Sequence, residues 1–241
     1  MAERSLHVAQ VCPWDHWERA SMTFCEARVC GLIETPANTW SNLAYILVGA
    51  LVIALSLRSR MGLSPAGAGI GVIALLVGVC SFSFHATGTY FFEILDVGAM
   101  FLYSAYALVT NARRAVPAMA QWSTTKSRAA YFSIVVMSVA AMTVPMWKGI
   151  GIFLFAAQVT LAGALEIRLL RKKRGAPTYA PLVALLVAFA LAWTAWWLDV
   201  LGVVCVPEQH LLHGHAVWHL LNSTCFYWLA LFYAPLRPAR R

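Results

Sequence analysis

Charged side chains are scarce in this sequence of 241 residues, where Asp, Glu, Lys and Arg make up 12%. Soluble globular domains carry about 25% charged residues and about 45–50% apolar ones, whereas 61% of this chain is hydrophobic. Acidic residues are scarcer than basic ones, with 10 Asp and Glu against 18 Lys and Arg. These shortages exclude an ordinary soluble domain, and a mean hydropathy of +0.69 indicates a protein of the lipid bilayer.

Two motifs are absent from the chain. The first 37 residues contain no basic start followed by an apolar stretch, so they do not have the pattern of a cleaved signal peptide. We expect residues 1–37 to form an ordered cap on the mature protein. Although the chain has 6 cysteines, no CxxC pair occurs, which argues against a zinc site built from cysteines.

Seven long apolar runs follow the first 37 residues. A helix needs about 20 mostly apolar residues to cross a hydrocarbon core of about 30 Å. Several runs also contain small residues, such as Gly71 and Gly78, that let membrane helices approach closely. We therefore predict an all-α membrane protein whose transmembrane domain covers residues 38–234. Its seven helices are expected at residues 38–57, 66–85, 91–111, 129–147, 150–168, 179–199 and 215–234.

Basic residues alternate between the loops in a way that predicts the orientation. Lys and Arg of short loops collect on the cytoplasmic side of a membrane, whereas Asp and Glu matter little. Fourteen of the 18 basic residues follow the first, third, fifth and seventh predicted helices. The N-terminus is therefore expected outside and the C-terminus in the cytoplasm, where residues 235–241 form a basic tail. The net charge of +8 then reflects orientation and anionic lipid headgroups, and no nucleic-acid partner is expected.

Three histidines fall at the outer ends of predicted helices. His85 ends the second apolar run, and His215 and His219 begin the seventh. A neutral imidazole buried near lipid needs a partner, and histidines four residues apart share one helix face. Three converging imidazoles predict a zinc site, because zinc takes three nitrogen ligands and keeps a fourth position for a water whose pKa falls to about 7.

Two further polar residues are expected at the same depth. Ser81 precedes His85 by one helical turn, and Asp96 begins the third apolar run. Asp96 could hold a water and carry its proton to a leaving group, and the Ser81 hydroxyl could donate to a developing oxyanion. These are the parts of a metallohydrolase that acts on a lipid carbonyl. The structural alternatives are a serine that packs between helices and histidines that bond within a bundle or line a pore.

Three segments carry a resemblance to a known family. SFSFHATGTYFFEILD holds Ser-x3-His followed by Asp, HGHAVWHLL holds His-x3-His beside a Trp, and NTWSNLAYILVG extends the match to the first helix. Over residues 25–233 the chain resembles the alkaline ceramidases, CREST-type seven-helix membrane metallohydrolases related to adiponectin receptors and Per1-type proteins. The resemblance implies zinc bound by three histidines, acid–base catalysis by an Asp and oxyanion assistance by a Ser, here His85, His215, His219, Asp96 and Ser81.

The same resemblance implies a calcium ion beside the zinc, held by an acidic N-terminal segment. Glu26 and Glu34 match part of that segment, but Arg28 stands where an Asn ligand is expected and Thr23 where an Asp is expected. A cation beside the ion would repel it. Two outcomes therefore stay open, one with calcium bound by Glu26 and Glu34, and one with an Arg28 salt bridge to either carboxylate in its place.

Cysteines add a further expectation for the outer side. Cys12, Cys25, Cys30 and Cys205 fall outside the membrane in the predicted topology, and outer compartments oxidise thiols. Four cysteines allow three pairings, and the residues alone do not choose among them. The family resemblance favours Cys25 with Cys205, which would tie the cap to the loop before the last helix and leave Cys12 with Cys30.

The expected function is that of an intramembrane zinc amidase that cleaves ceramide to a sphingoid base and a fatty acid. The resemblance supplies the ceramide. A Per1-like lipid esterase or phospholipase, a seven-helix receptor with structural zinc, and a haem-binding electron carrier are the alternatives. Compact loops and the absence of sorting signals favour a bacterial inner membrane over an endoplasmic reticulum or Golgi membrane. The expected partner is a membrane lipid, and the sequence does not determine the oligomeric state.

Overall fold

The computed structural model describes residues 11–58 and 65–236. Residues 1–10 of the expected cap, Arg60, and residues 237–241 of the expected basic tail lie outside the described residues. The described chain is all-α. Its elements are α1 Pro36–Trp40, α2 Leu43–Leu57, α3 Pro65–Thr87, α4 Tyr90–Ala115, α5 Pro117–Ala120, α6 Thr124–Met142, η1 Pro145–Trp147, α7 Ile150–Arg171, α8 Ala180–Val200, α9 Gly214–Tyr233 and η2 Ala234–Leu236.

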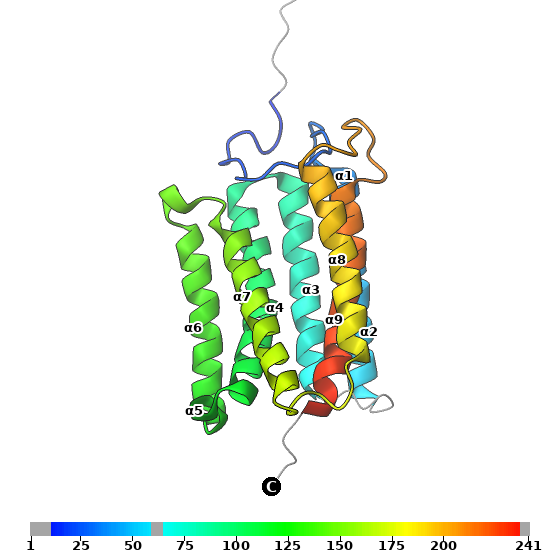
Figure 1. The fold of residues 1–241 in the computed structure, drawn as a ribbon. Helices are drawn as coiled ribbons and strands as arrows, with labels where there is room; N and C mark the ends of the chain where they lie inside the picture. Colours follow the sequence, from blue (N-terminus) through cyan, green and yellow to red (C-terminus); the bar gives the residue numbers. More distant parts are fainter. Residues whose placement is uncertain (1–10, 59–64, 237–241) are drawn as a thin grey trace, which may run out of the picture.

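The long helices form one bundle and run roughly side by side (Figure 1). Helix α3 packs against α2, α4 and α9, and α4 packs against α3, α6 and α7. The N-terminal segment and the loop between α8 and α9 lie together over one end of the bundle, and η2, where the described chain ends, lies at the opposite end (Figure 1). The N-terminal segment and residues 201–213 therefore meet at the capped end.

Five segments among the described residues are long and apolar enough to cross a membrane. They are Pro36–Leu57, Gly67–Thr87, Tyr90–Ala115, Ile150–Arg171 and Ala180–Val200. Helices α6 and α9, which correspond to the other two predicted spans, are not among them. Both are diluted by polar groups, since α6 begins with Thr, Lys and Arg residues and α9 carries histidines, an Asn, a Ser and a Thr along its first half. The chain is a multi-pass membrane protein by the length and composition of its helices.

Two predicted helices differ from the observed ones. The first is broken at Ser41–Asn42 into α1 and α2, because the Asn38 carbonyl accepts hydrogen bonds from the Ser41 hydroxyl and the Asn42 amide. The fourth, predicted over residues 129–147, runs instead over Thr124–Met142. Ser123 caps its start by accepting the Lys126 N–H at 3.1 Å, and the residue before Pro145 is unfavourable for a helix.

Helices α2 and α3 are in close contact through glycines. A Cβ added to Gly71 would lie 2.8 Å from the Gly49 carbonyl oxygen, and one added to Gly49 would lie 2.7 Å from the Gly71 carbonyl oxygen. Side chains at these positions would push the two backbones apart. The expectation that small residues in this run serve helix packing is confirmed at Gly71, and the close contact fixes α3, which carries two residues of the site.

The N-terminal segment is anchored to the bundle by one disulfide and by backbone hydrogen bonds, and a second disulfide closes a loop within the segment. Disulfides join Cys12 to Cys30 and Cys25 to Cys205, the pairing that the family resemblance favours. The Ala20 N–H donates to the Gly88 carbonyl at 3.1 Å, in the turn between α3 and α4. These links hold the segment against the ends of α3 and α9.

Candidate active site

The three predicted histidines meet beneath the cap. His85 lies in the last turn of α3, and His215 and His219 lie in the first turns of α9. One ring nitrogen from each lies within 4.8 Å of the others, and the Nε2 atoms of His85 and His215 are 3.0 Å apart. The side chains are almost fully buried, with 3%, 4% and 2% of the residue surface exposed. Such a cluster of buried imidazoles can hold a metal ion.

Ser41 orients the ring of His219. The Ser41 hydroxyl donates its one proton to the Asn38 carbonyl at 2.9 Å and lies 2.8 Å from His219 Nδ1. Since that proton is already donated, the hydroxyl oxygen accepts from Nδ1–H. This hydrogen bond places the proton of the neutral ring on Nδ1 and leaves the Nε2 lone pair free for a metal.

Asp199 holds the backbone of His215. This residue lies at the end of α8 and is 1% exposed. Its two carboxylate oxygens accept the His215 N–H at 3.1 Å and the Cys25 N–H at 2.9 Å. Gly214 permits the close approach, because a Cβ there would lie 2.5 Å from the Ala195 carbonyl oxygen. One buried carboxylate therefore fixes both the start of α9 and the cap.

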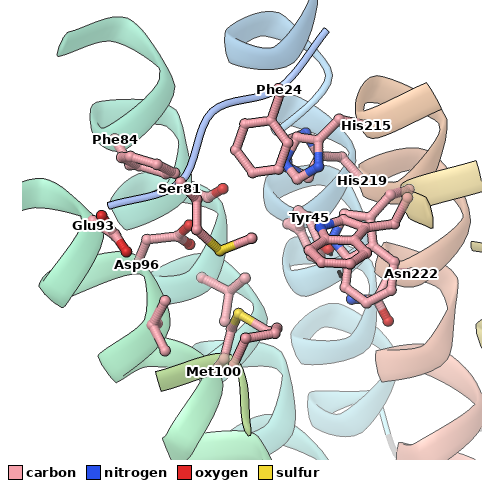
Figure 2. Close-up of a pocket in the computed structure, with 16 residues that line it drawn as sticks. Phe24, Tyr45, Ser81, Phe84, Glu93, Asp96, Met100, His215, His219 and Asn222 are labelled. Carbon is pink, nitrogen blue, oxygen red and sulfur yellow. Dashed lines mark hydrogen bonds between the residues drawn. The ribbon is translucent and has the colours of Figure 1, made fainter. Parts of the chain in front are cut away.

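Phe24 covers the histidines from the side of the cap. Its ring stacks on His215 with centroids 3.6 Å apart and planes at 26°, and its centroid lies 5.4 Å from that of His85. Figure 2 shows the Phe24 ring beside His215, above the pocket. The Cys25–Cys205 disulfide follows Phe24 directly, so it restrains this ring over the cluster.

Ser81 and Asp96 line the same pocket as His215 and His219. The Ser81 hydroxyl lies near the Asp96 carboxylate in this pocket. In Figure 2 these two side chains come from one side of the pocket, and His215 and His219 from the other. The cavity between them is about 50 Å³, which is space for a few water molecules. A carboxylate, a hydroxyl and imidazoles therefore surround one small buried volume.

The comparison with protein families agrees with this arrangement. The family model described as Ceramidase matches residues 18–240. The chain belongs to the Ceramidase family. No curated protein matches the sequence. Membership of the Ceramidase family implies ceramide amidohydrolase activity on a ceramide-like lipid, and the predicted family is confirmed.

The residues expected to hold calcium in a ceramidase are occupied by other partners here. Glu34 accepts two hydrogen bonds from Arg19 Nη1, at 2.7 Å on Oε1 and 2.9 Å on Oε2, and Arg28 Nε lies 3.7 Å from Oε2. Hydrogen bonding to Glu34 raises the pKa of Arg19. Glu26 accepts the N–H groups of Ala37 and Asn38 at the start of α1. Two guanidinium groups at Glu34 would repel a divalent cation, so these residues do not fit calcium.

A second group of metal-binding residue types lies close by. Cys25, Asp199 and His213 bring potential ligand atoms within 4.8 Å of one another. The Cys25 sulfur is in a disulfide with Cys205, and the Asp199 carboxylate accepts two backbone N–H groups. This group is therefore structural, and it supports the neighbouring His215.

Three supporting residues have a larger role than the sequence predicts. From the sequence alone, Asp199 is predicted to be an outer-loop acid that could orient a ligand histidine, and Ser41 to bond between helices. For Phe24 the sequence predicts no role. A weak signal did exist for Asp199, because an acid at the end of an apolar run is costly unless it has a partner. No signal in the sequence pointed to the stacking of Phe24 on His215.

Proposed function

We propose that this member of the Ceramidase family hydrolyses the amide of ceramide at a zinc ion held by His85, His215 and His219. The observation that carries the proposal is the convergence of three buried imidazoles from α3 and α9 on one point. The nitrogens of His85 and His215 are 3.0 Å apart, close to the roughly 3.3 Å between two nitrogen ligands of a tetrahedral zinc. Three neutral nitrogen donors suit zinc and leave a position open for reaction.

The burial of the three histidines gives further support for a bound ion. Each residue is at most 4% exposed, and buried polar atoms are rarely left without a partner. A zinc ion bound here would polarise the substrate carbonyl and lower the pKa of a coordinated water to about 7. Ser41 and Asp199 would keep His219 and His215 aimed at that ion.

Asp96 and Ser81 are assigned the proton and oxyanion roles. Asp96 takes a proton from the attacking water as its oxygen bonds to the acyl carbon, and returns a proton to the amide nitrogen as the C–N bond breaks. The Ser81 hydroxyl, which lines the same pocket, donates its one proton to the carbonyl oxygen as negative charge develops there. The products are a fatty acid and a sphingoid base, and hydrogen, oxygen and charge balance without a further reactant.

An apolar cavity below the site suits the acyl chain. It measures about 410 Å³ and lies between α4, α7, α8 and α9. On α4 it begins at Tyr103, three residues beyond Met100 of the histidine pocket. Leucines, valines and aromatic side chains form most of its wall. We assign the fatty-acyl chain to this cavity, with the amide reaching up to Asp96.

The orientation that we propose has seven spans, with the capped end outside and the chain terminus in the cytoplasm. Both disulfides lie at the capped end, as expected of an oxidising compartment. Most of the described arginines and lysines collect at the ends of α2, α4 and α7 and the start of α6, which is the opposite end of the bundle. The loops favour a bacterial inner membrane, in which residues 1–37 would cap the periplasmic side of the domain over residues 38–234.

The test is fatty-acid release from a panel of ceramides, ester lipids and N-acyl amides. Zinc-loaded wild-type protein is expected to release fatty acid from ceramide. Asp96→Asn is expected to keep its zinc and to lose about 100-fold or more in rate, the usual contribution of a positioned acid–base group. Glu208→Gln is the matched control, because Glu208 is an exposed acid of the α8–α9 loop and should leave the rate unchanged.

Three outcomes would overturn parts of this proposal. No release from any lipid would remove the enzyme and favour a receptor with a structural metal. Release from ester lipids alone would replace the amidase with a Per1-like lipid esterase. Full activity in Asp96→Asn would keep the hydrolase but remove Asp96 from the chemistry.

A further inference from the structure

A second polar cavity lies at the end of the bundle opposite the histidines. It measures about 380 Å³ and is bounded by the end of α4, the short helix α5 and the start of α6. This volume falls in the range of about 300–1,000 Å³ that is usual for small-molecule sites. The residues that line it are Tyr106, Val109, Thr110, Arg113, Arg114, Ala120, Thr124, Ser127, Arg128 and Tyr131.

The lining carries an excess of positive charge. Arg114 is neutralised by Glu166, with which it forms an ion pair at 2.5 Å outside the cavity wall. Arg113 and Arg128 have no ion pair within the described residues, and no acid is among the described side chains that line the cavity. Two guanidinium groups, of partly buried Arg113 and exposed Arg128, thus face a partly enclosed space without a counter-charge. Such an arrangement attracts an anion.

Arg113 has an unused donor at this site. One of its terminal nitrogens donates to the Trp122 carbonyl at 3.2 Å. Its Nε is fully buried and has no hydrogen-bond partner in the part of the chain that the structure describes. A guanidinium group presents its donors in a fork that fits two oxygens of a phosphate. The unpaired Nε shows that the described residues do not satisfy every donor of Arg113, a second observation besides the charge, and the terminal nitrogens of its fork can bind an oxyanion in the cavity that Arg113 lines.

Helix α6 contributes to the same end of the cavity. It begins at Thr124, so the positive end of its dipole lies at the cavity wall. Thr110 and Thr124 add hydroxyl groups that can donate to an oxyanion. Further along α6, Phe132 and Val136 are exposed apolar side chains that can contact the acyl chains of a lipid.

We propose that this cavity binds a phosphate-bearing anion, supplied in the membrane by the headgroup of an anionic phospholipid of the inner leaflet. Arg113 and Arg128 would hold the phosphate, and Thr110 and Thr124 would donate to its remaining oxygens. The lipid source rests on the orientation proposed above, which puts this end of the bundle at the cytoplasmic surface. Basic pockets between membrane helices on that side are suited to such headgroups.

The test is native mass spectrometry of the detergent-solubilised full chain with phosphatidylglycerol, phosphatidylcholine or inorganic phosphate. Wild-type protein is expected to retain phosphatidylglycerol in preference to phosphatidylcholine. Each arginine removed should weaken that binding by about fivefold, the attraction typical of one basic residue at a membrane surface. Arg113→Gln with Arg128→Gln should therefore weaken it by about 25-fold.

The matched control is Arg171→Gln with Lys172→Gln. It removes the same charge from exposed positions at the end of α7, outside the cavity, and should leave phosphatidylglycerol binding within about twofold of wild type. Equal losses in both double variants would indicate diffuse attraction and overturn the site, as would equal binding of the two lipids. Arg128→Gln alone, at an exposed position, decides the question if Arg113 proves necessary for folding.

Inorganic phosphate separates the two sources of the ligand. Displacement of phosphatidylglycerol by phosphate would support one shared oxyanion site. Binding of phosphate without phosphatidylglycerol would support the site for a soluble phosphate compound and overturn the lipid assignment. These binding measurements do not depend on hydrolysis. The lipid site can therefore be confirmed even if the proposed enzyme activity is refuted, and the enzyme activity can be confirmed even if the lipid site is refuted.

Discussion

Removal of the Ser41 hydroxyl tests how much a hydrogen-bond partner of a zinc ligand contributes to zinc affinity, because the ligand His219 itself stays in place. In the structure this hydroxyl accepts from His219 Nδ1 at 2.8 Å while donating to the Asn38 carbonyl. In Ser41→Ala the imidazole loses its hydrogen bond and can place its proton on either nitrogen. Only one of the two tautomers leaves Nε2 free to bind a metal.

The expected cost follows from these two losses. One hydrogen bond contributes about 1 kcal/mol net, and competition from the second tautomer adds to it. Partners of metal-binding histidines typically raise metal affinity by about 10- to 100-fold, which corresponds to roughly 1.4–2.7 kcal/mol. We therefore expect Ser41→Ala to bind zinc about 10- to 100-fold more weakly than wild type.

Competition with a chelator of known zinc affinity measures this change. Ser41→Thr keeps a hydroxyl group and should bind zinc nearly as tightly as wild type. Ser223→Ala is the matched control, because this buried serine on α9 donates only to the Leu220 carbonyl of its own helix, at 2.8 Å. Unchanged zinc affinity in Ser41→Ala, or an equal loss in Ser223→Ala, would refute the role given to Ser41.

Further predictions concern the cap and its contacts. Asp199→Ala should lower the free energy of unfolding by about 3–6 kcal/mol, since two charge-assisted hydrogen bonds of about 1.5–3 kcal/mol each are lost. Glu208→Ala is the control and should not lower it, and equal melting temperatures of the two variants would contradict this prediction. Cys25→Ser with Cys205→Ser should speed the loss of zinc to a chelator, because the Phe24 ring is no longer held over His215. An unchanged rate of zinc loss would contradict this prediction. A calcium-selective chelator should leave activity and melting temperature unchanged, whereas a fall in either would show that Arg19 does not exclude calcium.

The sequence carried most of the information about the helices and the reacting groups. Long apolar runs are required by the thickness of a bilayer, so their positions could be predicted to within a few residues. The histidines at 85, 215 and 219 and the acid at 96 stood out because polar groups at that depth need partners. Basic residues predicted an orientation, which remains a prediction.

The supporting contacts could not be predicted because they join distant parts of the chain. Asp199 meets Cys25 across 174 positions, and Ser41 meets His219 across 178. Hydropathy also did not predict the break after α1, because the break depends on the Ser41 and Asn42 side chains, which both donate to the Asn38 carbonyl. For calcium, the sequence identified Arg28 as the disturbing residue, yet the guanidinium bound directly to Glu34 is that of Arg19.

Metal content measured together with hydrolysis tests the central claim most directly. Purified wild-type protein is expected to contain about one zinc ion per chain, to lose ceramide hydrolysis when the metal is removed, and to regain it with zinc. His215→Ala should contain no zinc and release no fatty acid, whereas His16→Ala, at an exposed position in the cap, should match wild type. Fatty-acid release by fully metal-free wild-type protein would contradict the account.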